Sequence, residues 1–276
     1  MNIAKSKDGT KIAYDKIGTG PALILVTGAF GYRKFPAQIE LAKLLAGHFT
    51  VYSYDRRGRG DSGDTAPYAV EREIEDLGAL IREAGGSAHV WGLSSGAVLA
   101  LEGAARGLNI TRLVLHEPPF IVDPSDRKPP ADFKKHLSEL VAGDRRAEAV
   151  KYFMTEGMGV PSFIVGMMRM MPGVWSKLVA LAHTLPYDAA LLNDYFRGAP
   201  LPASRWSSVA MPALVMEGPE SPASLRHAAQ AAARALPNAR LLSKKGLGHT
   251  KKLNAGLISQ ELITFFQEEQ SLCTSK

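Results

Sequence analysis

Residues 90–97 read VWGLSSGA. This stretch contains the pattern Gly-x-Ser-x-Gly with Ser94 at its centre. We expect a strand before it, over 88–91, and a helix after it, from about 95 to 105. In that context the serine lies on a sharp strand-to-helix turn, with its hydroxyl exposed at the helix N-terminus. The positive end of the helix dipole favours developing negative charge there. Small residues at the two glycine positions let neighbouring segments pack against the turn, so the pattern predicts a nucleophilic serine.

The chain on both sides of this motif alternates between strand-like runs and helical segments. Residues 22–26 read ALILV, a continuous apolar run that suits a strand buried on both faces of a sheet. Repeated strand–helix units with short links predict a mostly parallel sheet that is covered by helices on both faces. The further strands are expected at 11–17, 50–54, 110–116, 213–217 and 239–243, and the further helices at 35–47, 70–84, 221–236 and 255–270.

The alternation breaks between residues 120 and 208. This block reads as several short helices that are rich in Met and Pro. Because the alternation resumes after it, we interpret the block as an insertion between two strands, placed as a lid over the carboxyl edge of the sheet. The expected domains are therefore a core made of 1–119 and 209–276, and a helical cap made of 120–208.

Length and composition fit this organisation. A chain of 276 residues suits one large α/β domain, or a core domain that carries an insert. Hydrophobic residues make up 46% and charged residues 22%, which excludes the disordered, collagen-like and low-complexity classes. The formal net charge of +6 is too small to indicate a nucleic-acid partner.

We expect a cytoplasmic protein without a membrane partner. Residues 1–5 lack the apolar core of a signal peptide, and the most apolar stretch, 21–30, is too short to span a bilayer. Cys273 is the single cysteine, so the chain cannot form an internal disulfide. It lies in the polar tail 271–276, where a catalytic thiol is not expected.

With these features the chain resembles the α/β-hydrolase superfamily over nearly its whole length apart from the cap block. Residues 55–62, DRRGRGDS, look like that family's D-x-R-G-x-G-x-S turn after the fourth strand. The resemblance implies the α/β-hydrolase fold, with a mostly parallel central sheet flanked by helices and a helical cap inserted after the sixth strand. Residues 58–63 also fit the dinucleotide-binding pattern G-x-G-x-x-G. That site needs the loop to open a helix at once, and the DTAP sequence of 64–67 does not read as a first helical turn.

The resemblance places a catalytic histidine after the last expected strand, where this chain has GLGHT at 246–250. His249 is therefore the expected general base, and the chain order Ser…His fits the family. Its imidazole would accept the proton of the Ser94 hydroxyl and later return it to the leaving group.

The acid is where the family pattern breaks. Most members carry Asp about three residues after a Gly that closes the seventh strand, and that position holds Ser221. Two carboxylates remain as candidates: Glu220 next to it, and Glu117 at the end of the sixth strand. We favour Glu117, because a lone buried carboxylate is costly and the imidazole of His249 would supply a partner. Haloalkane dehalogenases and lactone hydrolases of the zearalenone-hydrolase type also keep their acid there, and the latter resemble this chain locally. Glu220 stays the alternative acid.

The resemblance also implies an oxyanion hole made of two backbone N–H groups. One is the amide of Ser95, directly after the nucleophile. The other comes from the loop after the third strand, where the family usually has His-Gly and this chain has Thr27-Gly28. Either Ala29 or Gly28 is expected to donate. In the cap, methionines and aromatic residues suggest a lipophilic pocket, because Met suits adaptable apolar surfaces. The expected pocket residues are Phe30, Met154, Met158 and Trp175.

These residues predict a serine hydrolase that cleaves a carboxylic ester or lactone of a fairly lipophilic small molecule through an acyl-enzyme. A serine at position 94 argues against dehalogenase and epoxide-hydrolase chemistry, which need Asp there. Two alternatives stay open. The same triad would also serve C–C bond or thioester hydrolysis or a biosynthetic cyclase or lyase step, and the scaffold would also serve as a non-catalytic small-molecule-binding module. We expect no metal or organic cofactor, since there is no HExxH or paired Cys/His set. The expected state is a monomer or homodimer.

Overall fold

The computed structural model describes residues 1–249 and 253–268, so Cys273 lies outside the described residues. Its centre is an eight-stranded sheet with the strand order β1-β2-β4-β3-β5-β6-β7-β8. β1 and β2 form an antiparallel hairpin at one edge, and β3 to β8 run parallel. The expected parallel sheet is therefore confirmed. The strands are β1 (Asn2–Lys5), β2 (Lys11–Ile17), β3 (Ala22–Val26), β4 (Thr50–Tyr54), β5 (Ala88–Leu93), β6 (Ile110–His116), β7 (Ala213–Glu217) and β8 (Ala239–Ser243).

Helices cover both faces of this sheet, and the side chains of β3 show why. Successive residues of a strand point to opposite faces. Ile24 and Val26 therefore join the core beneath α2, α3 and α9, whereas Leu23 and Leu25 join the core beneath α1 and α10. An apolar run without alternation is what a strand covered on both sides requires. The bounds are α1 (Pro36–Leu45), α2 (Val70–Glu83), α3 (Ser95–Ala105), α9 (Ala223–Ala235) and α10 (Ala255–Gln267).

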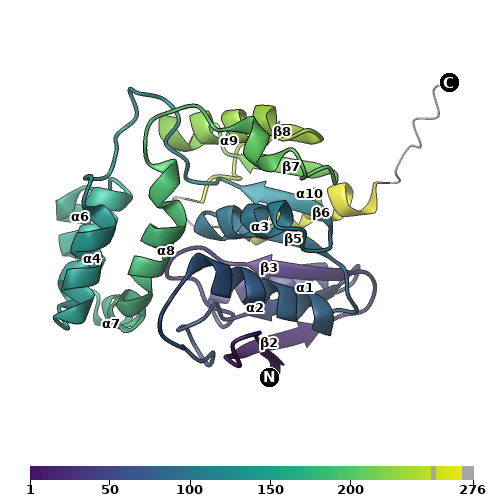
Figure 1. The fold of residues 1–276 in the computed structure, drawn as a ribbon, viewed down its shortest axis with the longest axis horizontal. Coiled ribbons are helices and arrows are strands. Elements are labelled where there is room, and N and C mark those ends of the chain that lie inside the picture. The colour runs from purple at the N-terminus through teal and green to yellow at the C-terminus, as the bar shows by residue number, and fades with distance from the viewer. Residues whose placement is uncertain (250–252, 269–276) are drawn as a thin grey trace.

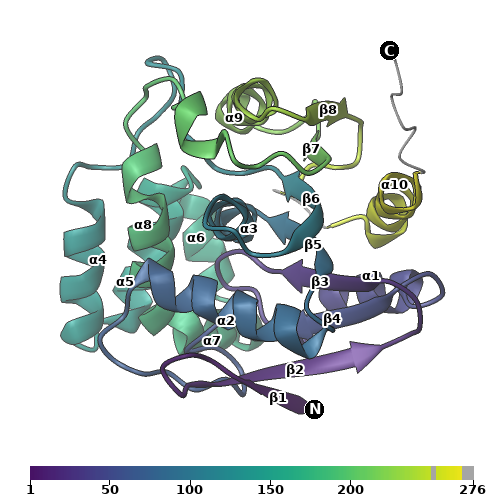
Figure 2. The ribbon, with the colours of Figure 1, turned by 45° about the vertical axis from the view of Figure 1, so that its right-hand side comes forward.

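The chain between β6 and β7 forms a group of short helices at one end of the sheet (Figures 1 and 2). Side chains such as Phe133, Leu137, Phe153 and Leu185 give this group a small apolar core of its own. The two ends of the block pack elsewhere, since Phe120 and Trp206 belong to the main core. The helices are α4 (Phe133–Ala142), α5 (Arg146–Tyr152), α6 (Ser162–Arg169), α7 (Pro172–Leu181) and α8 (Leu185–Leu192).

In the part of the chain that the structure describes, no single helix is both long and apolar enough to cross a membrane. One pair that is bent by 108°, Ser162–Arg169 with Pro172–Tyr195, meets the length and composition for a span only when its two parts are taken together.

Candidate active site

Ser94 lies on the turn between β5 and α3 in a strained backbone conformation. Its φ of 54° and ψ of −125° fall in a region that non-glycine residues rarely adopt. The flanking glycines allow the close packing that holds this turn. A Cβ on Gly96 would lie 2.3 Å from the carbonyl oxygen of Val26, and one on Gly92 would lie 2.5 Å from Cα of Ala97. The turn is thereby pressed against the end of β3.

Glu117 lies next to this turn, directly after β6. The Ser94 amide donates a hydrogen bond to the carbonyl oxygen of His116 (2.9 Å), which places the two strand ends side by side. Glu117 itself has a positive φ of 46°, and its side chain is fully buried. Its amide donates to the carbonyl oxygen of Met216 on β7 (2.9 Å). A non-glycine residue held at positive φ is uncommon and is found most often at sites of function.

The structure brings the carboxylate of Glu117 and the ring of His249 together. Oε2 of Glu117 lies 2.5 Å from Nδ1 of His249 and also accepts the His249 amide at 2.9 Å. The other oxygen, Oε1, accepts the amide of Gly218 at 3.1 Å. Burial alone would raise the pKa of Glu117, but the hydrogen bond from the His249 ring and the further hydrogen bonds to the carboxylate together outweigh it and lower the pKa to about 2. An ionised carboxylate accepts only, so Nδ1 carries the proton and Nε2 is left as the acceptor.

Glu220 contacts the histidine loop but holds it by the backbone. Its Oε1 accepts the amide of Gly246 at 2.7 Å. The loops after β7 and β8 touch here, since a Cβ on Gly218 would lie 2.4 Å from the amide nitrogen of Gly248. Within the described residues, Glu220 makes no hydrogen bond to the His249 ring. The arrangement therefore favours Glu117 as the partner of the ring and gives Glu220 the role of anchoring the loop.

The loop after β3 lies directly on the nucleophile. A Cβ on Gly28 would lie 2.9 Å from Cβ of Ser94 and 3.5 Å from its Oγ. The carbonyl oxygen of Gly28 accepts the guanidinium of Arg59 (2.7 Å), and Phe30 has a positive φ of 60°. In a planar trans peptide the N–H points opposite to the C=O, so the Ala29 amide points away from Arg59. Ser95 is the first residue of α3, so its amide has no hydrogen-bond acceptor within the helix. Neither amide donates a hydrogen bond to any group in the described ranges, and both remain the predicted donors.

A cluster of four buried charges lies beneath these donors, and one of its members comes from the cap. The side chains of Arg56 and Arg59 meet Glu73 of α2 and Asp188 of α8, all of them at most 2% exposed. In the sequence, the two arginines belong to the family turn, and Asp188 belongs to no motif. A cue was present, because arginines in a buried turn require carboxylate partners, but the sequence does not say which carboxylates.

The expected pocket residues lie at different depths. The ring of Phe30 packs edge-on against Phe153 of the cap, with ring centroids 5.6 Å apart. Met154 is buried in the cap core, Trp175 is half-buried against it, and Met158 is 54% exposed. The role of these four residues in substrate binding stays a prediction.

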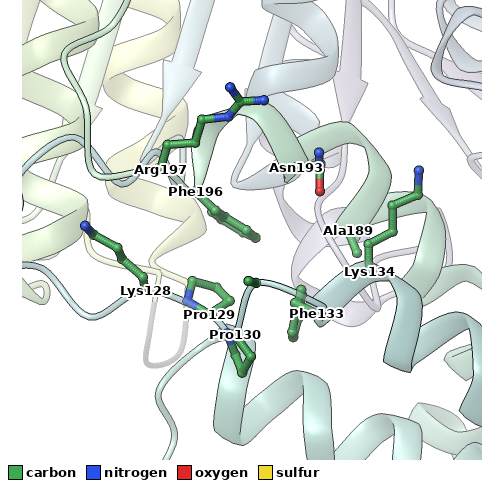
Figure 3. Close-up of a pocket in the computed structure, with 10 residues that line it drawn as sticks. Lys128, Pro129, Pro130, Phe133, Lys134, Ala189, Asn193, Phe196 and Arg197 are labelled. Atoms are coloured by element: carbon green, nitrogen blue, oxygen red, sulfur yellow. The ribbon is translucent and has the colours of Figure 1, made fainter.

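A cavity of about 360 Å³ opens between the segment before α4 and the end of α8 (Figure 3). Its described lining includes Phe133 and Phe196 but none of Ser94, Glu117 and His249. Figure 3 shows the charged ends of the basic side chains at its rim pointing away from its centre. The cavity therefore has a mixed apolar and basic lining and lies apart from the candidate triad.

Among the described residues, no group of three or more His, Cys, Asp or Glu side chains is arranged to hold a metal ion.

A second imidazole, that of His116, lies next to the ring of His249. It is fully buried, and its Nε2 lies 2.5 Å from the carbonyl oxygen of Leu247. Burial lowers the pKa of His116 to about 4, so this ring is neutral at pH 7 and supports the loop from below.

Comparison with known proteins supports the fold. An alpha/beta hydrolase from Sphaerobacter thermophilus shares 49% sequence identity, with a TM-score of 0.88 over 96% of this chain and 100% of that chain. The enol-lactonase from Burkholderia xenovorans (22% identity, TM-score 0.65, 97% of this chain and 100% of that chain) and an esterase from Rhodococcus sp. (20%, 0.67, 96% and 97%) share the fold. An uncharacterized hydrolase of Bacillus subtilis, YraK, is 35% identical over 116 residues, a match that spans 40% of this chain and 42% of that relative.

The sequence pattern of one family, described as the alpha/beta hydrolase family, matches residues 23–255. The match covers the sheet from β3 to β8 together with the inserted helices. The expected fold class is confirmed, and the chain belongs to the alpha/beta hydrolase family.

Proposed function

We propose that the protein is a serine hydrolase that cleaves a carboxylic ester or lactone of a lipophilic small molecule. The observation that carries this proposal is the pairing of His249 Nδ1 with the buried, ionised carboxylate of Glu117, beside a strained turn that presents Ser94. This pairing fixes the imidazole tautomer in which Nε2 accepts a proton, which is the form that a general base requires.

In the proposed reaction, the Ser94 oxygen attacks the carbonyl carbon and its proton passes to Nε2 of His249. The carboxylate of Glu117 stabilises the imidazolium that forms. Negative charge on the carbonyl oxygen is received by the amides of Ser95 and Ala29; the loss of one such donor typically costs about 10²–10³-fold in rate. The imidazolium then protonates the leaving alcohol, and the C–O bond breaks to give an acyl-enzyme. Water, activated by the same imidazole, hydrolyses the acyl-enzyme and restores the hydroxyl of Ser94.

The apolar side chains of the cap support a lipophilic substrate. Phe30, in the loop that contacts Ser94 through Gly28, packs against Phe153 of the cap core. The named esterase and enol-lactonase among the structural relatives make esters and lactones the bonds to test first.

A fluorophosphonate probe tests the proposal, because it phosphonylates only a serine that a base activates. We expect stoichiometric labelling of the wild type, none of Ser94→Ala, and normal labelling of the matched control Ser259→Ala in α10. Turnover of p-nitrophenyl acetate and octanoate, a lactone and a thioester then ranks the bonds, with the longer ester preferred over acetate. A wild-type protein that neither labels nor turns over any of these substrates would leave the binding module as the better account.

A further inference from the structure

We propose that Asp188, which the cap contributes from α8, is a positioning residue that orients both donors of the oxyanion hole. This inference rests on the proposed function. Asp188 is fully buried, although it lies 93 residues from Ser95 and 129 from Arg59 along the chain. Both of its oxygens are engaged with groups that hold an oxyanion donor, one on each side of Ser94.

The first connection runs through the side chain of Ser95. Its hydroxyl donates to Oδ1 of Asp188 at 2.6 Å, and the same oxygen accepts Nη1 of Arg56 at 2.9 Å. A serine oriented by a fixed carboxylate cannot rotate freely, so the first residue of α3 is held on two sides. The amide that Ser95 offers to the oxyanion is part of this same residue.

The second connection runs through Arg59. Its Nη2 donates to Oδ2 of Asp188 at 2.6 Å, while its Nη1 donates to the carbonyl oxygen of Gly28 at 2.7 Å. The guanidinium is planar, so fixing one nitrogen on the carboxylate fixes the direction of the other. The Gly28 carbonyl also accepts the Gly31 amide at 3.1 Å, so Arg59 and Gly31 together hold the plane of the following peptide and with it the direction of the Ala29 amide.

The charges in this cluster balance only when Asp188 is present. Arg56 and Arg59 carry two positive charges, and Glu73 and Asp188 carry two negative charges. Glu73 binds Arg56 through both oxygens, at 2.6 and 2.8 Å, so Asp188 is the carboxylate left for Arg59. Burial opposes ionisation of Asp188, but Arg59 and Arg56 outweigh it and lower its pKa. A buried arginine without its carboxylate would shift or draw in water, and the Gly28 peptide would lose the shorter of the two hydrogen bonds that hold its carbonyl.

The variant Asp188→Asn tests this inference, because it keeps the shape of the side chain and removes its charge. We expect kcat to fall about 10–100-fold with KM within about threefold, since the donors act on the charge that develops in the transition state. Affinity for an alkyl boronic acid, which forms a tetrahedral adduct on serine, should fall by a similar factor. Fluorophosphonate labelling of Ser94 should persist at a reduced rate, which separates failure of this inference from failure of the proposed function.

Asp76→Asn is the matched control. Asp76 is equally buried and pairs with Arg57 of the same turn, at 2.8 and 2.9 Å, but holds neither Gly28 nor Ser95. We expect it to lower the melting temperature while kcat stays within about threefold. Ser95→Ala, which leaves the charges intact, should lower kcat about 3–10-fold, and it serves alone if Asp188→Asn does not fold. Equal kcat values for Asp188→Asn and Asp76→Asn, or a wild-type kcat in Ser95→Ala, would overturn the inference.

Discussion

The carboxyl edge of the sheet and the outer cap helices α6 and α7 differ in how far their side chains are buried and hydrogen-bonded. At the sheet edge, Glu117 and Asp188 are fully buried, and each of their carboxylate oxygens accepts at least one hydrogen bond. On α6 and in the link from α6 to α7, large apolar side chains are exposed. Phe163 is 68% exposed and Met170 75%, and Met167 and Met171 are also more than half exposed.

The two regions therefore differ in how rigidly their side chains are held. Groups that meet developing charge must be held within a fraction of an ångström, so the edge is built from buried pairs and strained turns. A surface that meets apolar molecules of varied shape gains from adaptable side chains, and methionine is the most adaptable apolar residue. An exposed apolar patch on an otherwise polar protein usually marks a contact surface. The position of α8, between these regions, explains why it carries both buried apolar residues and Asp188.

The largest effect is expected at Glu117, the proposed acid at the edge of the sheet. Glu117→Gln keeps the shape of the side chain but presents Nδ1 of His249 with a neutral partner. We expect kcat for a p-nitrophenyl ester to fall about 10³–10⁴-fold, because the imidazolium loses its counter-charge and the tautomer is no longer fixed. Glu220→Gln is the control: its amide oxygen still accepts from Gly246, so kcat should stay within about threefold. If Glu220→Gln is the inactive variant instead, the acid is Glu220.

Low pH should lower the free energy of unfolding over a defined pH range. The pKa of Glu117 falls from its usual 4.5 to about 2 in the folded protein. A depressed carboxyl pKa stabilises the fold above pH 4.5, and this contribution is lost as the pH falls toward 2; its full size is about 3 kcal/mol. From pH 6 to pH 3, the free energy of unfolding in urea should therefore fall about 2 kcal/mol further in the wild type than in Glu117→Gln. Parallel pH curves for the two proteins would contradict the assignment.

One substitution type should have opposite effects in the two regions. Ala at Gly28 would place its Cβ 2.9 Å from the Leu93 carbonyl oxygen and from Cβ of Ser94, so the loop must shift. We expect kcat to fall about 10-fold or more, since a displaced donor loses most of its effect. Ala at Gly166, inside α6, meets no atom within 4 Å and should stabilise the protein by about 0.5–1 kcal/mol through helix propensity. Activity assays and thermal melts of both variants decide; a destabilised Gly166→Ala would mean that the α6 surface is packed after all.

The sequence predicts the sheet well because its strands are short apolar runs with strong local character. The expected bounds of the strands at 22–26 and 110–116 agree with β3 and β6, whereas the strand before the motif runs two residues further than expected, to Leu93. Helix ends differ for local reasons: α9 begins at Ala223, after Pro222, rather than at 221. The parts that sequence patterns cannot supply are contacts between distant positions and unusual backbone angles.

The site illustrates the same limit. Ser94 and His249 come from local motifs, and the preference for Glu117 over Glu220 came from the cost of a lone buried charge, which the hydrogen bond to His249 fits. Nothing local indicated that Glu117 has a positive φ, or that Asp188 would meet Arg56 and Arg59 across the cap boundary. Such pairs become predictable only when the fold has placed both partners.

The spacing of the candidate triad along the chain has a consequence for biosynthesis. Glu117 precedes His249 by 132 residues, and Asp188 lies between them. During translation, Ser94 and Glu117 are therefore synthesised well before His249, the proposed base. If Ser94 and His249 act as proposed, the chain needs β8 and the loop after it before it can react with an ester.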